Sequence, residues 1–229
     1  MNLNQRSYKK ELLDEDAIPF DALEKNLHEL NFINTYLGGH AITINGIKHL
    51  IGNKKTVTVC EIGCGGGDNL VAIYKWCTQH KIELKVIGID IKQDCINIAK
   101  QQTFPEAAWI IDDYKNAVFD VKPDIIFSSL FCHHFTDEQL MEQLQWMKAN
   151  SQLGFFINDL QRHWLAYFSI KFLTKIFSHS YLVKHDAPLS VARGFVKKEW
   201  CNLLDASTIP NYTIQWQWAF RYLIIYKHD

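Results

Sequence analysis

Hydrophobic residues in the middle of the chain form short blocks that alternate with amphipathic segments. The blocks are rich in β-branched or aromatic residues, which is typical of buried parallel strands. Segments with helical spacing of apolar residues separate them. Strands that alternate with helices in this way predict parallel βαβ units with right-handed crossovers. The predicted strands span residues 56–63, 85–90, 107–112, 123–130 and 154–159, and the predicted helices span 69–80, 92–102 and 136–149. Thr136 and Gln139 have the spacing of a capping box at the start of the last of these helices.

The segments before and after this region have other patterns. Residues 9–37 have helical leucine stripes with a break near Pro19, and a second short helix is expected around residues 42–50. Gly38 and Gly39 offer a stop between the two helices. The N-terminal part of the chain is therefore expected to be helical.

Beyond the fifth strand, residues 163–177 are apolar on almost every side of a helix, so we expect other parts of the chain to cover them. Residues 190–206 look helical, and residues 212–228 resemble two strands that meet near Ala219. The aromatic residues of 163–177 either seal the core or line an apolar pocket, and we favour one face for each role.

Together these patterns predict an α/β fold, a Rossmann-like doubly wound, mostly parallel seven-stranded sheet with a helical N-terminal extension and a helical insertion after the fifth strand. We expect one domain, 1–229. Its expected parts are a helical extension or lid (1–52), a cofactor-binding core (55–160), a helical acceptor-side segment (161–206) and C-terminal strands (207–229).

Composition narrows the class of protein. Hydrophobic residues make up 48 % and charged residues 21 %, which is typical of a globular protein, and the net charge of -1 gives no basic excess for binding nucleic acid. The N-terminus lacks the apolar core of a signal peptide, and no apolar run approaches the roughly 18 residues that span a bilayer. We expect a cytoplasmic protein. Nothing in the sequence predicts its oligomeric state.

Six cysteines are present without a CxxC pair, so we expect no zinc site of the usual spacing and no metal. They are expected to be reduced thiols that pack as small hydrophobic residues. The cysteines are Cys60, Cys64, Cys77, Cys95, Cys132 and Cys201.

The stretch VCEIGCGGGDNL, residues 59–70, contains four of the chain's 11 glycines between a predicted strand and a predicted helix. Glycines at this position allow close approach of the backbone to a ligand, and the helix N-terminus presents free amides. A dinucleotide fingerprint needs a third glycine where this chain has Asp68. Glu61 would repel a pyrophosphate but suits a cation. S-adenosylmethionine carries an ammonium and a sulfonium and has no phosphate, so the charges favour it.

EIGCGGG followed by GID resembles the motifs of class I S-adenosylmethionine-dependent methyltransferases. FSSLFCHHFTDEQL and NDLQRHWLAY, after the fourth and fifth strands, match a subset of that superfamily. ELLDEDAIPFDALEKNLHELNFIN and HDAPLSVARGF also resemble small bacterial methyltransferases of phenolic or polyketide pathways. The resemblance implies S-adenosylmethionine as cofactor and S-adenosylhomocysteine as product.

The resemblance also implies roles for individual residues. Glu61 and the glycine backbone would hold the methionine end, and Asp90 would bind the ribose hydroxyls. Asp112 or Asp113 would face the adenine amino group, and a solvated turn is the less favoured alternative for both. Leu130 would lie beside the transferring methyl. The candidate cofactor-binding residues are Glu61, Gly63, Cys64, Gly65, Gly67, Asp90, Ile91, Asp112, Asp113 and Leu130.

The acceptor side is expected after the fourth and fifth strands. His133 and His134 are candidate catalytic bases, because an imidazole pKa near 6.5 suits removal of a phenolic proton, or else they pack and cap a turn. Asp159, Arg162 and His163 form a second candidate cluster, for which an ion pair that anchors the next helix is an equal alternative. The acceptor-lining candidates are Asp159, Arg162, His163, Tyr167 and His185, the last expected in a loop before Pro188.

These features predict methyl transfer from S-adenosylmethionine to a small aromatic hydroxyl acceptor in secondary metabolism. The alternatives are methylation of carbon or nitrogen in a quinone-like or other small molecule, a nicotinamide-dependent oxidoreductase, and a binding protein without catalysis. An RNA methyltransferase is disfavoured because NDLQR lacks an N/D-P-P-Y/F motif and no basic extension is visible.

Overall fold

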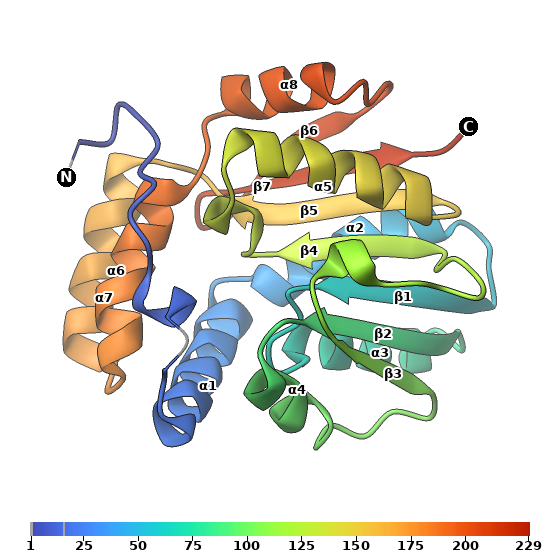
Figure 1. Cartoon of the computed structure of the whole chain (residues 1–229), viewed down its shortest axis with the longest axis horizontal. Helices are drawn as coiled ribbons and strands as arrows, with labels where there is room; N and C mark the ends of the chain where they lie inside the picture. The colour runs from blue at the N-terminus through green and yellow to red at the C-terminus, as the bar shows by residue number, and fades with distance from the viewer. Residues whose placement is uncertain (1, 16) are drawn as a thin grey trace.

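Seven strands form one sheet in the computed structural model, which describes residues 2–15 and 17–229 (Figure 1). The strand order is β3-β2-β1-β4-β5-β7-β6, with β1 to β5 parallel and β7 antiparallel to both of its neighbours. The predicted fold class is confirmed. The strands are β1 (Thr56–Ile62), β2 (Glu83–Asp90), β3 (Ala107–Ile111), β4 (Ile125–Ser129), β5 (Gly154–Leu160), β6 (Thr213–Gln217) and β7 (Arg221–Lys227).

Helices cover both faces of the sheet. Alternate residues of β1 point to opposite sides, so Val57 and Val59 join one hydrophobic cluster while Cys60 and Ile62 join the other. The first cluster is completed by α2 (Gly39–Ile51), α3 (Asp68–Gln79) and α4 (Gln93–Ala99). The second is completed by α5 (Asp137–Asn150) and α8 (Lys197–Ala206). Thr136 and Gln139 form the predicted capping box at the start of α5.

The N-terminal extension is helical only in part. A short 3-10 helix, η1 (Leu12–Asp14), precedes α1 (Phe20–Tyr36), which starts directly after Pro19 and ends before Gly38. Residues 9–11 and 17–19 are not helical, so the prediction of a helix from residue 9 is wrong there. Tertiary contacts hold this segment: the amide of Ser7, for example, donates to the carbonyl of Ala192 at 3.0 Å.

The segment after β5 forms three helices: α6 (Trp164–Phe177), α7 (Tyr181–Arg193) and α8. The predicted single helix over 190–206 is wrong, because Phe195 exchanges backbone hydrogen bonds with residues 160 and 162 and so interrupts it. The loop predicted around His185 is also wrong, since α7 continues through Pro188. The helix persists because proline removes only one backbone bond, while Ser180 caps its start and most of its apolar side chains are buried.

The apolar helix α6, which the sequence predicts must be covered by something, is covered by this chain on one face. Ala166, Tyr167 and Thr174 are buried because α6 packs mainly against α7, and among the described residues nothing covers the opposite face. Trp164, Leu165, Phe168, Phe172, Ile176 and Phe177 are exposed by 43 to 70 % of their surface. Among the described residues, no helix combines the length and apolar character needed to cross a membrane.

The packing of α2 on the sheet predicts a sensitive position. A Cβ atom at Gly46 would lie 2.5 Å from the ring of Phe156, which is fully buried and stacked on Phe127 with ring centroids 4.8 Å apart. Gly46→Val should therefore lower the free energy of unfolding by about 2 kcal/mol, since overpacking outweighs the gain in helix propensity. Urea denaturation measures this. Lys48→Ala, at an exposed position of the same helix, should stay within about 0.5 kcal/mol of wild type; equal losses in both variants would contradict the packing explanation.

Candidate functional site

A cavity of about 690 Å³ lies at the carboxyl ends of the central strands. Strand order reverses at β1, whose neighbours are β2 and β4, and open α/β sheets bind ligands at such a switch point. The loop after β1, the ends of β2 and β4, and the N-terminal extension form the walls. Leu23, Leu27 and Leu30 of α1 also line it, and Leu27 lies 3.4 Å from where a Cβ atom of Gly65 would be. A cavity of this volume suits a small organic ligand.

The glycine loop has the conformation that its sequence suggests. Gly63, Gly65 and Gly67 all have positive φ, which favours glycine. A Cβ atom at Gly63 would overlap the ring of Phe131, so the backbone of β1 and the segment after β4 approach as closely as glycine allows. The carboxylate of Asp90 fixes the loop by accepting from the amides of Gly65 and Lys92, both at 2.9 Å.

Glu61 is a buried carboxylate with only one of its oxygens paired. The side chain is 1 % exposed, and its Oε1 accepts from Asn69 Nδ2 at 2.8 Å. Its Oε2 is buried and has no hydrogen-bond partner among the described residues. Burial raises the pKa of Glu61 well above its usual value, against a smaller opposing effect of the Asn69 hydrogen bond. Glu61 lines the cavity, from which a cationic ligand would satisfy the free oxygen.

Asp112 and Asp113 border the same cavity and are exposed. Asp112 Oδ1 accepts from Asn116 Nδ2 at 2.8 Å, and Asp113 caps the short helix η2 (Tyr114–Asn116). Their hydrogen bonds are those of an ordinary turn, but their place on the cavity wall leaves them available to a ligand.

The backbone at the end of β4 is strained. Leu130 has a φ of 53°, and its amide donates to the carbonyl of Asn158 at 2.9 Å. Positive φ is uncommon for a residue with a branched side chain, and such strain gathers at functional sites. The turn carries Leu130, Phe131 and His134 into the cavity wall.

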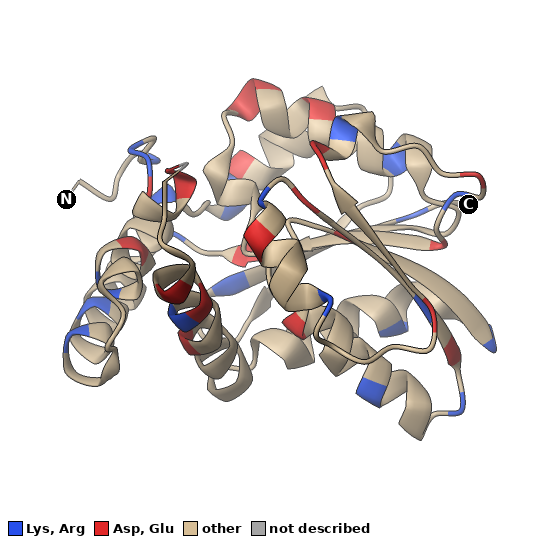
Figure 2. Ribbon diagram, turned by 60° about the horizontal axis from the view of Figure 1, so that its bottom comes forward, with Lys and Arg blue, Asp and Glu red and all other residues tan. Residues whose placement is uncertain are grey.

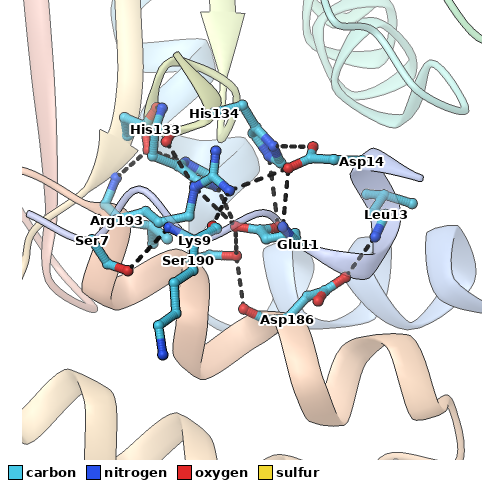
Figure 3. A network of polar contacts seen from close by, with 12 residues as sticks. Ser7, Lys9, Glu11, Leu13, Asp14, His133, His134, Asp186, Ser190 and Arg193 are labelled. Atoms are coloured by element: carbon cyan, nitrogen blue, oxygen red, sulfur yellow. Dashed lines mark hydrogen bonds and ion pairs between the residues drawn. The ribbon is translucent and has the colours of Figure 1, made fainter. Parts of the chain in front are cut away.

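Behind this turn, two imidazoles and three carboxylates form a polar cluster (Figure 3). His133 Nδ1 lies 2.7 Å from Asp159 Oδ1, and His134 Nδ1 lies 2.7 Å from Asp14 Oδ1. The two Nε2 atoms face the carboxylate of Glu11, at 3.6 Å for His133 and 3.7 Å for His134. His133, Glu11 and Asp159 are buried, whereas His134 and Asp14 reach the cavity.

Residues of α7 tie the N-terminal segment to this cluster (Figure 3). Arg193 donates from Nε to the carbonyl of His133 at 3.0 Å and from Nη1 to Asp14 at 3.2 Å. Ser190 donates to Glu11 at 2.8 Å, and Asp186 accepts from the amides of residues 12 and 13. Segments far apart in sequence thus meet in one hydrogen-bonded network.

The three carboxylates of the cluster have different pKa values because their surroundings differ. Burial raises the pKa of Glu11 to about 7, although the charge of His134 opposes this. Burial would also raise the pKa of Asp14, but the hydrogen bond and charge of His134 lower it to about 2. For Asp159 the charge and hydrogen bond of His133 outweigh burial in the same way and lower the pKa. Glu11 is therefore the one of these acids that titrates near neutral pH.

The structure brings most predicted site residues to one place. Gly67 lies behind the cavity wall, where it caps α3. His133 and Asp159 belong to the polar cluster, outside the wall itself. The predicted residues that line the cavity are Glu61, Gly63, Cys64, Gly65, Asp90, Ile91, Asp112, Asp113, Leu130 and His134.

The other four acceptor-lining candidates also lie outside the cavity wall. Arg162 pairs with Glu199 of α8 at 2.7 Å, whereas the ion pair considered above would anchor the next helix, α6. His163 caps α6 through Leu165, and Tyr167 packs against α7. His185 is half-exposed beside Asp186. Their predicted contacts with an acceptor stay predictions.

Glu11, Asp14 and Arg193 were not singled out from the sequence as site residues. Their signal was present in the stretches ELLDED and SVARGF, which carry the family resemblance outside the core. Nothing in the residues themselves says that these stretches meet His133 and His134, because the contacts span 60 residues or more.

Comparisons with known proteins agree with this geometry. Residues 59–150 match a family model described as a methyltransferase domain. The plantazolicin methyltransferase BpumL in complex with SAH is 19 % identical, with 91 % of each chain covered and a TM-score of 0.70. Magnesium protoporphyrin IX methyltransferase from Synechocystis PCC 6803 is 14 % identical, with 84 % of each chain covered and a TM-score of 0.55.

Human N-acetylserotonin methyltransferase in complex with SAM is 14 % identical, covering 91 % of this chain and 56 % of that one, with a TM-score of 0.64. A search of curated protein sequences gives no match. At these identities the solved structures show a shared fold, and the family model identifies the central domain. Residues 59–150 therefore match a methyltransferase domain, and the chain as a whole has the fold of methyltransferases crystallised with S-adenosylmethionine or SAH.

Proposed function

We propose that this chain transfers the methyl group of S-adenosylmethionine to a hydroxyl group of a small aromatic acceptor in secondary metabolism. The unpaired, buried carboxylate oxygen of Glu61 on the wall of the 690 Å³ cavity carries the proposal. A buried carboxylate that lacks a partner requires a cation or a proton donor, and the methionine end of this cofactor supplies an ammonium.

The residues of the cavity fit the cofactor from one end to the other. Glu61 and the glycine loop would hold the methionine end, and the amides of the loop are already oriented by Asp90. Asp90, whose pKa burial raises against two opposing amide hydrogen bonds, lies where ribose hydroxyls could donate to it. The exposed carboxylates of Asp112 and Asp113 would face the adenine amino group.

The bound cofactor supplies an electrophilic methyl group, and methyl transfer is an in-line displacement. The protein's task is to align the acceptor oxygen with that carbon and to exclude water. Leucines of α1 would close the cavity over the cofactor, in agreement with the proposed lid role of residues 1–52. Residues 55–160 would bind the cofactor, and 161–206 would support the acceptor side.

The turn after β4 offers the wall for an aromatic acceptor. The rings of Phe131 and Phe135 contact each other edge to face with their centroids 4.8 Å apart, and both residues line the cavity. Aromatic walls suit a planar ring. His134 and Asp14 also border the cavity, so we assign removal of the hydroxyl proton to the cluster that they form with Glu11. A pKa of about 7 makes Glu11 a suitable final proton acceptor at neutral pH.

The type of acceptor draws support from the comparisons. The plantazolicin methyltransferase BpumL has been crystallised with desmethylPZN analogs and SAH, which favours a natural-product acceptor here too. Lysine and arginine residues are dispersed over several elements in Figure 2. We therefore favour a small molecule over a nucleic acid, and a cytoplasmic location.

Cofactor binding should depend on pH through Glu61. A carboxyl with a raised pKa keeps its proton to a higher pH in the free protein and must lose it to pair with an ammonium, so binding releases a proton wherever the group is still protonated. The affinity for S-adenosylhomocysteine should therefore rise with pH until the pH exceeds the raised pKa of Glu61. In Glu61→Gln the affinity for S-adenosylhomocysteine should be at least about 10-fold lower and should no longer rise with pH. Calorimetric titration at several pH values measures both.

Asp112→Asn is the matched control, because it removes an exposed carboxylate from the same cavity. It should keep the pH slope even if its affinity changes. Wild-type affinity in Glu61→Gln, or an affinity that falls as pH rises, would contradict the role of Glu61.

Turnover should depend on the cluster at His134. With labelled S-adenosylmethionine and a panel of catechols, hydroxyquinones and amines, a hydroxylated aromatic should gain one methyl group, detected by mass spectrometry. His134→Gln should lower kcat for that acceptor by about 100-fold or more while cofactor affinity changes little. His80→Gln, exposed at the end of α3, should behave as wild type. Unchanged turnover in His134→Gln would exclude the role, and methylation of amines alone would favour the nitrogen alternative.

A further inference from the structure

The arrangement of Glu11, His133 and His134 differs from that of an ordinary hydrogen-bonded cluster. Each imidazole makes its short contact through Nδ1 and directs Nε2 toward Glu11 (Figure 3). Among the described residues, neither Nε2 atom forms a hydrogen bond. The separations of 3.6 and 3.7 Å from the Glu11 oxygens exceed the usual range of such bonds. Three side chains thus converge without bonding to one another.

These separations match the spacing of ligands around a metal ion. Two ligand atoms bound at 2.0–2.1 Å in tetrahedral geometry lie about 3.4 Å apart. One ligand atom from each of the three residues lies within 4.8 Å of the others. Two imidazoles and one carboxylate form a donor set that suits borderline divalent metals such as zinc and iron(II), and not magnesium or calcium.

The partners of the imidazoles have the arrangement found around metal-bound histidines. In metal sites the second ring nitrogen of a histidine ligand donates to a carboxylate or carbonyl, which fixes the tautomer and orients the ring. Asp159 and Asp14 accept in this way from His133 and His134, both at 2.7 Å. Asp159 is held in turn by the amides of His133 and Leu160. Both Nε2 lone pairs are thereby presented to one point.

The local charge also favours a cation. Glu11, Asp14, Asp159 and Asp186 bring four carboxylates into the network of Figure 3, and all but Asp14 are buried. Among the described residues Arg193 is the guanidinium that contacts two of them, Glu11 and Asp14, while Arg6 is paired with Asp137. Two imidazolium protons or one divalent ion would each reduce the excess of negative charge by two units.

We propose that Glu11, His133 and His134 bind one divalent transition-metal ion, with Asp159 and Asp14 orienting the two histidines. The ion would occupy the same Nε2 and carboxylate atoms as the proton assigned to this cluster above, so the two are alternative occupants and bound metal would suppress methyl transfer. The ion would lie behind the turn after β4 and adjoin the 690 Å³ cavity through His134. The site joins the N-terminal segment to the sheet, because Glu11 precedes η1 while both histidines belong to η3 (Cys132–His134).

Metal binding is measured on the full chain after stripping with a chelator, with Zn²⁺ as the calorimetric probe and Co²⁺ as the spectroscopic one. Wild type should bind one equivalent of Zn²⁺, and excess Zn²⁺ should raise its Tm. The Co²⁺ form should show visible d–d bands without the intense thiolate charge-transfer band, which separates this site from binding to cysteines. Glu11→Gln and His134→Gln should each weaken Zn²⁺ affinity at least about 100-fold, and Asp14→Asn by about 10- to 100-fold.

His80→Gln is the matched control, because it removes an exposed histidine and should bind Zn²⁺ as wild type does. Circular dichroism verifies the fold of each variant, and His134, on the cavity wall, is the substitution that disturbs packing least. Absence of stoichiometric binding in wild type would overturn the proposal and leave protonated imidazoles as the balancing charge. Zn²⁺ binding that survives in folded His134→Gln, or thiolate bands with Co²⁺, would overturn it equally. None of these measurements depends on methyl transfer.

Discussion

A carboxylate shut off from water must find a positive charge or a set of hydrogen-bond donors, and this constraint organises the carboxyl edge of the sheet. Asp90 meets it with two backbone amides and so fixes the glycine loop. Asp159 meets it with His133, which fixes the turn after β4. Glu61 has a donor, Asn69, for only one of its two oxygens among the described residues. Asp90 and Asp159, which have partners, fix the shape of the site. Glu61 keeps one oxygen that a cationic ligand would satisfy.

The N-terminal segment serves both the fold and the site. It fastens to α7 through Asp186 and Ser190, and it delivers Asp14 and Glu11 to the histidines after β4. The same segment leads into α1, whose leucines line the cavity. A binding site at the switch point of a sheet is open by itself, and here an extension outside the matched domain of residues 59–150 adds to its wall.

The sheet and its main binding loop follow from local sequence pattern, because β-branched blocks, capping residues and glycines act over a few residues. All seven strands were expected, and so were the roles of Thr136 and Gln139 at the start of α5. Three features were not expected: the helix through Pro188, the break at Phe195 and the bare face of α6. Tertiary contacts, or the lack of such contacts among the described residues, decide all three. His133 and His134 were identified from the sequence as site candidates. Their carboxylate partners at positions 11 and 14 were not, because only tertiary contacts bring them to the histidines.

The distance along the chain between partners in this network affects how the protein is made. Arg6 donates to the carbonyl of Arg193, 187 residues later, so a ribosome needs roughly 10 to 40 s to add the partner after the arginine itself. Strands β1 to β5 emerge well before then and can assemble in order. The segment around Arg6 can thus dock only after Arg193 has been added, and the pocket acquires this part of its wall later than its parallel strands.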